Sequence, residues 1–564
     1  MTQRFNVAVV GSGFGGSILA CRLAQAGRSV CVLERGRRWN ATDFPRSPSQ
    51  VARDGFWNVD DGRFGVMEYR AFKQMHVIQG SGVGGGSLHY FNVHIRPPAS
   101  IFKHPRWPRR VNLNVLRPYY ELAREMLDAG TLVPPPGREL PARTVAFQEA
   151  CRRAGRRPEL VPIAVHTDGP RLNPRGRVQQ LPCDFSGNCA LGCATNAKNA
   201  MDVTYLPLAE RHGAEVRPLH TVEVVEPLSD GGYRVSFSQR DPDRPERTEV
   251  GAIEAETVVV SAGTLGTNEL LLRCRDEYKT LPKLSPALGC GFSGNGDFLL
   301  AGTFTDRDVD SSWGPSITAG VDVGTGGRQA YIEDLGYPDQ LVWFIEGMIA
   351  AAAFTVNPVR VLRILELFAS NRLALKGATD RISHEREALF GGGRTRGLLP
   401  YLGMCEDAAD GRFVLDEGGT FDLRWNPRAS APRFFELERV MRELSSALDG
   451  SYVSSPLWDW PNRELLTAHP LGGCAMAGDR RRGVVNEYGE VHGYPGLFVA
   501  DASVIPTALA RNPSATISAL SERTAFHMLH GRELRVDDPL RPPTSWPEEA
   551  APVIEEHISV GVPA

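Results

Sequence analysis

The sequence predicts an α/β protein in which a parallel sheet with flanking helices is joined to an α+β domain built on an antiparallel sheet. Two observations favour this fold class. Residues 5–10 form a β-branched, apolar run, which is followed by a glycine-rich turn and a helical pattern. Residues 297–460 contain alternating segments such as "DFLLAGTF" and "GRFVLDEGGTFDLRW", which are typical of antiparallel strands with one buried face.

The bulk properties exclude several classes of function. A chain of 564 residues is too long for one hydrophobic core, so we expect at least two domains around a shared cleft. The net charge of -3 gives no basic excess for nucleic acid. No apolar run reaches the length of a membrane span, so we predict no transmembrane segment. The start, "MTQRFNVAVVGSGFGG", lacks the features of a secretion signal and predicts a cytoplasmic location.

The segment "FNVAVVGSGFGGSILACRLAQAGRSVCVLERG" has the pattern of a Rossmann-like dinucleotide-binding unit. Gly11, Gly13 and Gly16 form G-x-G-x-x-G between a strand and a helix, where they allow a tight turn, approach of a pyrophosphate and helix packing. Glu34 closes the second strand, where a carboxylate accepts hydrogen bonds from an adenosine ribose. The motif does not separate FAD from NAD, and an ordinary glycine-rich turn is the alternative.

A second glycine cluster lies in "VIQGSGVGGGSLHYFNVHIRPP", residues 77–98. With almost no side chains, this segment allows close approach of a flat ligand and leaves main-chain amides free to donate hydrogen bonds. The alternative is a flexible surface loop. The glycines are Gly80, Gly82, Gly84, Gly85 and Gly86.

Four motifs in this order produce a family resemblance. The N-terminal fingerprint and "GSGVGGGSL" are followed by "HPLGGC" and by "GLFVADASVIP...NPSATISALSERTA". From residue 4 to residue 530 the chain resembles the glucose–methanol–choline (GMC) oxidoreductases, particularly the cholesterol-oxidase branch. The resemblance implies FAD, oxidation of an alcohol and a substrate domain that interrupts the FAD domain. The expected FAD-binding parts are residues 1–296 and 461–535, with the substrate domain at 297–460 and an irregular tail at 536–564.

The resemblance also assigns individual residues to FAD. The ADP half would be held by Gly11, Gly13, Gly16 and Glu34, with Val222 in an adenine-side strand and Asp501 at the ribityl or pyrophosphate portion. The flavin side would pass along Gly80, Gly84, Gly85, Gly86 and Ser87 and reach Asn92 near the isoalloxazine. Some relatives attach FAD covalently through a histidine in this loop. His89 lies there, so a covalent link is an alternative to the non-covalent one that we expect.

The catalytic pair implied by the resemblance is His469 and Asn512. A neutral imidazole can accept the hydroxyl proton, and an amide can hold the substrate oxygen so that its C–H bond points at flavin N5. Cholesterol oxidases also use a glutamate of the substrate domain. Glu346, in "LVWFIEGMIAAAA", is the first candidate for it, and Glu333 and Glu366 are alternatives. A structural, ion-paired glutamate is an equally good interpretation of Glu346.

The segment 358–377 predicts a basic, amphipathic helix of the substrate domain. We favour an ordinary surface helix. The alternative is a lid that makes peripheral contact with a membrane while an apolar substrate enters.

Three cysteines in "LPCDFSGNCALGCATNAKN", Cys183, Cys189 and Cys193, have the spacing C-x5-C-x3-C. This spacing fits neither a zinc ribbon nor a four-cysteine cluster. It resembles the three cysteines of GMC dehydrogenases whose catalytic subunit binds a [3Fe–4S] cluster. Packed thiols without iron, or an adventitious metal site, are the alternative.

The function that we expect is FAD-dependent oxidation of a bulky, apolar alcohol, with a 3-hydroxysteroid as first candidate and His469 as base. The electrons would pass to O2 or, if the cysteines hold iron, to an electron-acceptor partner. One alternative is a flavin photodecarboxylase, a lyase on the same fold. A second is a GMC dehydrogenase of another alcohol that passes electrons through a [3Fe–4S] cluster. Another is a flavin-bound redox partner or sensor without a substrate of its own.

Overall fold

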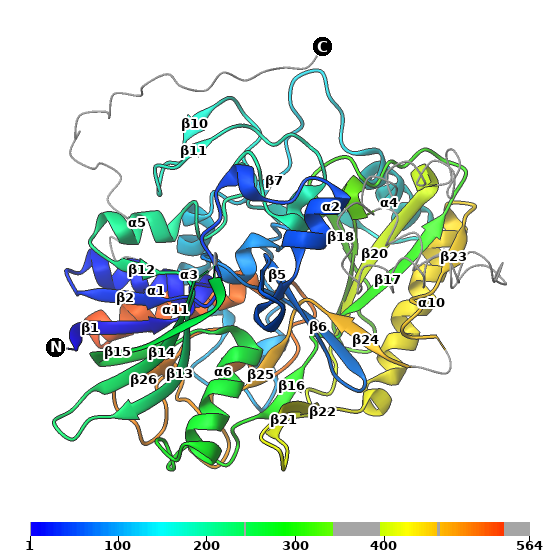
Figure 1. Cartoon of the computed structure of the whole chain (residues 1–564). Coiled ribbons are helices and arrows are strands. Elements are labelled where there is room, and N and C mark those ends of the chain that lie inside the picture. Colours follow the sequence, from blue (N-terminus) through cyan, green and yellow to red (C-terminus); the bar gives the residue numbers. More distant parts are fainter. Residues whose placement is uncertain (1, 242–243, 342–394, 460–462, 535–564) are drawn as a thin grey trace.

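The computed structural model describes residues 2–241, 244–341, 395–459 and 463–534. An α/β half contains both the first strand and the last described helix, and a half built on antiparallel strands lies beside it (Figure 1). This arrangement confirms the predicted fold class. The predicted helix at 358–377, Glu346 and Glu366 lie outside the described residues.

The α/β half is organised around a seven-stranded sheet with the order β12-β2-β1-β15-β14-β13, in which β26 also pairs with β15. The neighbours of β1 and β26 are parallel, whereas β13, β14 and β15 form an antiparallel meander. The strands are β1 (Gln3–Val10), β2 (Val30–Leu33), β12 (Glu215–Arg217), β13 (His220–Pro227), β14 (Tyr233–Asp241), β15 (Arg244–Val260) and β26 (Leu497–Val499).

Helix α11 lies at the centre of the helical layer that covers this sheet. It packs against α1 and α3, and all its residues from Ser514 to Phe526 are buried. Glu522 of α11 is paired with Arg22 of α1 through two hydrogen bonds of 2.8 and 2.9 Å, and it accepts a third from the Tyr205 hydroxyl of α5. These bonds satisfy a buried carboxylate that would otherwise be costly. The helices are α1 (Phe14–Gln25), α3 (Leu113–Met126), α5 (Tyr205–Arg211) and α11 (Ser514–His530).

The second half contains a six-stranded antiparallel sheet with the order β23-β17-β20-β19-β18-β8. Helices α4 (Ala142–Arg153) and α10 (Ala431–Ala447) pack against it. The strands are β8 (Pro158–Leu160), β17 (Phe298–Phe304), β18 (Ala319–Asp322), β19 (Ala330–Asp334), β20 (Leu398–Cys405) and β23 (Ser451–Val453). Because β8 comes from before residue 297, this sheet draws on two distant parts of the chain. The predicted domain boundaries stay a prediction.

Two smaller sheets each combine strands from distant parts of the chain. One has the order β24-β6-β5 and the other the order β22-β21-β16-β25. Strands β24 and β25 come directly before and after His469. The strands are β5 (Met67–Ala71), β6 (Met75–Gly80), β16 (Cys290–Ser293), β21 (Gly411–Leu415), β22 (Phe421–Arg424), β24 (Leu465–Thr467) and β25 (Leu471–Gly473).

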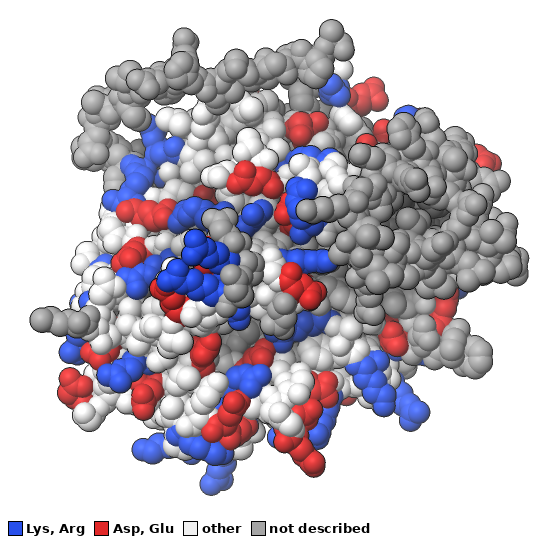
Figure 2. Space-filling view, in the orientation of Figure 1, with Lys and Arg blue, Asp and Glu red and all other residues white. Residues whose placement is uncertain are grey.

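The surface matches the nearly neutral composition. Acidic and basic side chains are interspersed over the face shown in Figure 2. In the part of the chain that the structure describes, the helices are too short or too polar to cross a membrane.

The first turn of α1 gives a testable prediction about stability. A methyl group on Gly15 would lie 1.5 Å from the carbonyl oxygen of Ala500, so the main chains of α1 and of the segment after β26 would have to separate. We expect Gly15→Ala to lower the free energy of unfolding of the FAD-free protein by about 1–3 kcal/mol, measured by urea denaturation. Gly478→Ala, at an exposed position with no atom within 4 Å, is the control. Equal stability of the two variants would contradict this packing.

Candidate active site

The G-x-G-x-x-G turn closes onto the neighbouring strand ends. Gly11 has a φ of +93°, and a Cβ there would lie 2.4 Å from the carbonyl oxygen of Ser261, which follows β15. A Cβ on Gly16 would lie 2.1 Å from the carbonyl oxygen of Gly11, so this glycine lets α1 approach β1. Helix α1 begins at the N-cap Gly13 without a side-chain cap or an acidic residue in its first turn. Its first amides are therefore available to a phosphate group.

Glu34 is held in place next to this turn. It is 5% exposed and accepts hydrogen bonds from the amide and hydroxyl of Ser12, at 2.9 and 2.7 Å, and from the amide of Gly36 at 2.9 Å. The amide of His220, at the start of β13, donates to the Glu34 carbonyl. Val222 of the same strand is partly buried, and its place on the adenine side stays a prediction.

The second glycine loop packs directly on the first. The amide of Gly84 donates to the Ser12 hydroxyl at 3.0 Å, and a Cβ on Gly85 would lie 2.6 Å from the Cα of Gly13. A Cβ on Gly80 would in turn contact the carbonyl oxygen of Gly85. Gly85 begins the 3₁₀ helix η4 (Gly85–Leu88), and Gly86 follows Gly85. The Ser87 hydroxyl donates to the Gly84 carbonyl and accepts from the Met201 amide. The structure thus brings together the two glycine motifs that the sequence places 70 residues apart.

Asp501 follows β26, where the carboxyl ends of β1, β15 and β26 meet. Its carboxyl group accepts hydrogen bonds from Thr267 and from both the amide and hydroxyl of Ser503. Burial raises the pKa of Asp501 above its usual value, and these bonds oppose the rise. Nucleotides bind at such carboxyl-terminal edges of parallel sheets.

Asn92 ends the glycine loop in a left-handed conformation, with a φ of +67° and a fully buried side chain. Its Nδ2 donates to the sulfur of Cys189 at 3.1 Å. Its Oδ1 is buried and has no hydrogen-bond partner among the described residues. Such a group is costly unless something absent from the protein chain satisfies it.

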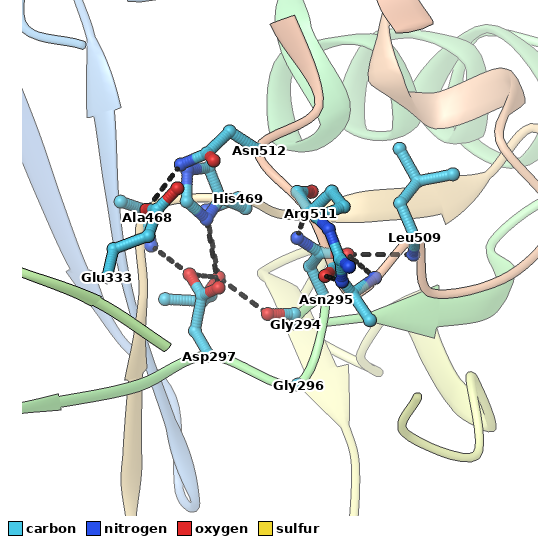
Figure 3. Close-up of polar contacts among 12 residues, drawn as sticks. Gly294, Asn295, Gly296, Asp297, Glu333, Ala468, His469, Leu509, Arg511 and Asn512 are labelled. Carbon is cyan, nitrogen blue, oxygen red and sulfur yellow. Dashed lines mark hydrogen bonds and ion pairs between the residues drawn. The ribbon is translucent and has the colours of Figure 1, made fainter. Parts of the chain in front are cut away.

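His469 forms a dyad with Asp297, a residue that the sequence did not single out (Figure 3). The distance between His469 Nδ1 and Asp297 Oδ1 is 2.9 Å. Asp297 Oδ2 accepts from the Thr467 hydroxyl at 2.9 Å and from the Ala468 amide at 3.0 Å. Because a carboxylate only accepts, it places the proton of a neutral imidazole on Nδ1 and leaves the Nε2 lone pair for another proton.

Asn512 lies beside Glu333 of β19 in the same view (Figure 3). Its Nδ2 donates to Glu333 Oε2 at 3.2 Å, while Asn512 Oδ1 and Glu333 Oε1 are buried without a partner in the described chain. Burial raises the pKa of Glu333 to about 8, although the hydrogen bond from Asn512 opposes this rise. Among the described residues, Glu333 is therefore the glutamate considered from the sequence that contacts Asn512.

The turn between β16 and β17 supports both parts of this site. Its Asp297 contacts His469, and its Asn295 side chain contacts the main chain of residues 509–511, directly before Asn512. Neither residue has a sequence signal, since a lone Asn or Asp in a glycine-containing turn normally predicts only the turn.

Comparison with known proteins agrees with this architecture. Models of the GMC oxidoreductase family match residues 13–274 and 457–521, which together make up more than half of the chain. The chain belongs to the GMC oxidoreductase family. It is an FAD-dependent oxidoreductase that acts on alcohols.

Among GMC proteins, the chain is similar to the cholesterol oxidase of Acinetobacter baumannii, with 28% identity over 93% of this chain and 94% of that protein. It is 29% identical to the cholesterol oxidase of Mycobacterium tuberculosis, over 93% of this chain and 91% of that protein. The solved structure of pyridoxine 4-oxidase from Mesorbium loti covers 93% of this chain with a TM-score of 0.60 and 15% identity. At that identity the likeness shows the GMC fold alone.

The residues present fit the FAD of a GMC enzyme. The uncapped start of α1 suits a pyrophosphate, and the glycine loop provides main chain that side chains would obstruct. The unpartnered oxygens of Asn92 and Asn512 would each be satisfied by a bound ligand with hydrogen-bond donors. Burial lowers the pKa of His89 to about 3, so this imidazole is neutral. A covalent link through it stays a prediction.

The cysteines do not fit the expected [3Fe–4S] cluster as they lie in the structure. Among the described residues there is no group of three His, Cys, Asp or Glu side chains that could hold a metal ion. Each sulfur instead contacts a different N–H: Cys183 that of Phe185, Cys189 that of Asn92 and Cys193 that of Lys198. The sequence supplies three thiols, one for each iron of such a cluster. The spacing does not determine whether the three sulfurs point towards one another.

The dyad predicts a large effect of Asp297→Asn. The new amide would turn one donor towards His469, Thr467 or Ala468, all of which donate to Asp297. We expect kcat to fall by about 10²-fold while bound flavin is retained, because the imidazole is no longer aligned.

Asp407→Asn is the matched control. Asp407 is a buried acid that accepts from Ser293 and Gly296 of the same turn. An equal loss of kcat in both variants would show that the turn matters and the contact with His469 does not. The measurement is stopped-flow flavin reduction with alcohol substrate.

Proposed function

We propose that this enzyme oxidises a bulky, apolar secondary alcohol, and that a 3-hydroxysteroid is the first substrate to test. The observation that carries the proposal is the apolar face of the six-stranded sheet on which Glu333 lies. The sterol named in the two bacterial relatives supports the same choice.

That face can be identified from the register of the strands. Glu333 and Tyr331 alternate with Asp334, whose carboxyl group contacts Thr144 of α4 on the opposite face. On the Glu333 face, β20 contributes Leu402 and Met404 as cross-strand neighbours. These side chains belong to a hydrophobic cluster, separate from the main core, that also contains Leu299, Ile317, Tyr331 and Phe185. An apolar substrate body next to the polar pair would match this surface.

His469 is proposed to accept the hydroxyl proton of the substrate at Nε2. Asp297 then stabilises the imidazolium through the bond at Nδ1, so the proton is taken up without a change in ring orientation. FAD, when bound, supplies the acceptor for the hydride that leaves the carbinol carbon. The carboxamide of Asn512 orients the substrate oxygen, and the adjacent carboxyl group of Glu333 fixes that carboxamide.

Glu333 is proposed to have a second role on the substrate. A carboxyl group that changes protonation near neutral pH can move a proton between carbons of a steroid once the ketone has formed. This is the role that the resemblance to cholesterol oxidases assigns to a substrate-domain glutamate. A substrate whose ketone product has no β,γ double bond would be oxidised without this step.

The proposed function is tested by anaerobic reduction of the bound flavin. We expect cholesterol and related 3-hydroxysteroids to bleach the flavin absorption, and O2 to restore it with formation of peroxide. Reduction by none of a broad panel of secondary and long-chain alcohols would overturn the proposal. Light-dependent release of CO2 from fatty acids, in the same preparation, would instead identify a photodecarboxylase.

The raised pKa of Glu333 predicts a pH dependence. Burial disfavours the charged form, so raising the pH from about 4.5 to about 8 costs the folded state stability relative to the unfolded chain, in which this carboxyl ionises freely. Glu333→Gln removes this cost. We expect the difference in Tm between the variant and the wild type to increase from pH 4.5 to pH 8.5. The exposed Glu159, which contacts Tyr331 on the same sheet, provides the control Glu159→Gln. A Tm difference that is independent of pH would contradict the burial of an ionising group at residue 333.

A further inference from the structure

We propose that Asn295 is a positioning residue that fixes Asn512 against Glu333. The proposal rests on the roles suggested above for Asn512 and Glu333 and adds the residue that holds them together. Asn295 lies in the turn 293–297, two residues before Asp297, and its side chain is fully buried.

Asn295 makes three hydrogen bonds to the segment before Asn512. Its Oδ1 accepts hydrogen bonds from the amides of Leu509 and Ala510 at 2.8 and 3.1 Å. Its Nδ2 donates to the carbonyl oxygen of Arg511 at 2.9 Å. One side chain therefore contacts three consecutive residues of the segment that ends at Asn512 (Figure 3).

The main chain of residues 509–512 is strained and lies outside regular secondary structure. Ala510 has a φ of +50°, in the left-handed region that a residue with a Cβ rarely adopts. No helix or strand includes residues 509–512, so regular main-chain bonds do not fix them. The three bonds from Asn295 replace the missing regular partners and offset the cost of the strained conformation.

Arg511 connects the same segment to the sheet that carries Glu333. The guanidinium group of Arg511 is buried, forms an ion pair of 2.6 Å with Asp322 of β18 and lies 3.9 Å from the ring centre of Tyr331. Both partners belong to the sheet that carries Glu333. The segment before Asn512 is thus fixed to the turn 293–297 on one side and to the Glu333 sheet on the other.

The turn that contains Asn295 also determines the position of His469. The turn that provides Asn295 also provides Asp297, which orients His469. A single turn of five residues therefore sets the positions of both polar groups that would contact the substrate. Loss of Asn295 should change the position of Asn512 and leave the contact between Asp297 and His469 intact.

The test uses Asn295→Asp in the FAD-containing protein. Aspartate tolerates the φ of +58° at this position, but it cannot donate to the Arg511 carbonyl and places an oxygen against it. The readout is the infrared C=O band of protonated Glu333, identified by its loss in Glu333→Gln and followed through a pH titration without substrate.

The expected result follows from the groups around Glu333. The hydrogen bond from Asn512 and the charge of Arg511 lower its pKa, whereas Asp334 and Asp297 raise it. Displacing residues 511 and 512 weakens both lowering effects, so the band should persist to higher pH in Asn295→Asp, as it should in Asn512→Ala. The double variant should shift the titration no further than Asn512→Ala alone.

Asn268→Asp is the matched control. Asn268 is also fully buried and donates to two main-chain carbonyls, those of Thr264 and Gly472, but does not contact residues 509–512. Its Glu333 titration should equal that of the wild type. Identical titrations in Asn295→Asp and the wild type would overturn the proposal, as would an equal shift in Asn268→Asp.

Kinetics separate positioning from the proposed substrate. With any alcohol that reduces the flavin, Asn295→Asp should lower kcat by about 10²-fold and change KM less, because binding of the apolar body is not affected. If no sterol is oxidised but the infrared shift is present, the substrate assignment fails and the positioning role stands.

Discussion

The geometry of this site depends on the hydrogen bonds of the buried Asp297 carboxylate. A carboxylate in the protein interior is tolerated only when hydrogen bonds satisfy its oxygens. Here the donors are the ring of His469, the hydroxyl of Thr467 and the amide of Ala468. A shift of β24 or of the residues after it would leave the charge unsatisfied. The cost of burying Asp297 therefore selects one position for the imidazole.

The turn that contains Asp297 connects two different sheets. Strand β16 leads into it from the small sheet that includes β25, and β17 continues from it into the six-stranded sheet. His469 lies between β24 and β25, Asn512 lies just before α11, and Glu333 lies on β19. Polar groups from three separate parts of the chain thus meet where the flavin-binding half contacts the apolar sheet.

The sequence predicted those features that depend on local pattern. The strand, glycine turn, helix and second strand with Glu34 are contiguous, so their spacing specifies their geometry. The motif around His469 and Asn512 was recognised through its resemblance to a family. Asp297 and Asn295 could not be found in this way, because their partners are 172 and 214 residues distant and a single Asp or Asn has no pattern. For the three cysteines, the sequence pattern suggested more than the structure shows. Their closeness in the sequence is compatible with one shared metal site, but their sulfurs contact different N–H groups.

The placement of β26 has a consequence for the packing of the nucleotide fingerprint. Strand β15 pairs with β14 up to Ala255, but its last residues, Val258–Val260, pair with β26 instead. The carbonyl of Ala500 then forms the surface on which Gly15 rests. Gly15 and Ala500 are 485 residues apart in the sequence, so a distant segment of the chain completes the packing of the nucleotide fingerprint. The sheet edge beside the nucleotide fingerprint is therefore complete only once Leu497–Val499 have paired with β15.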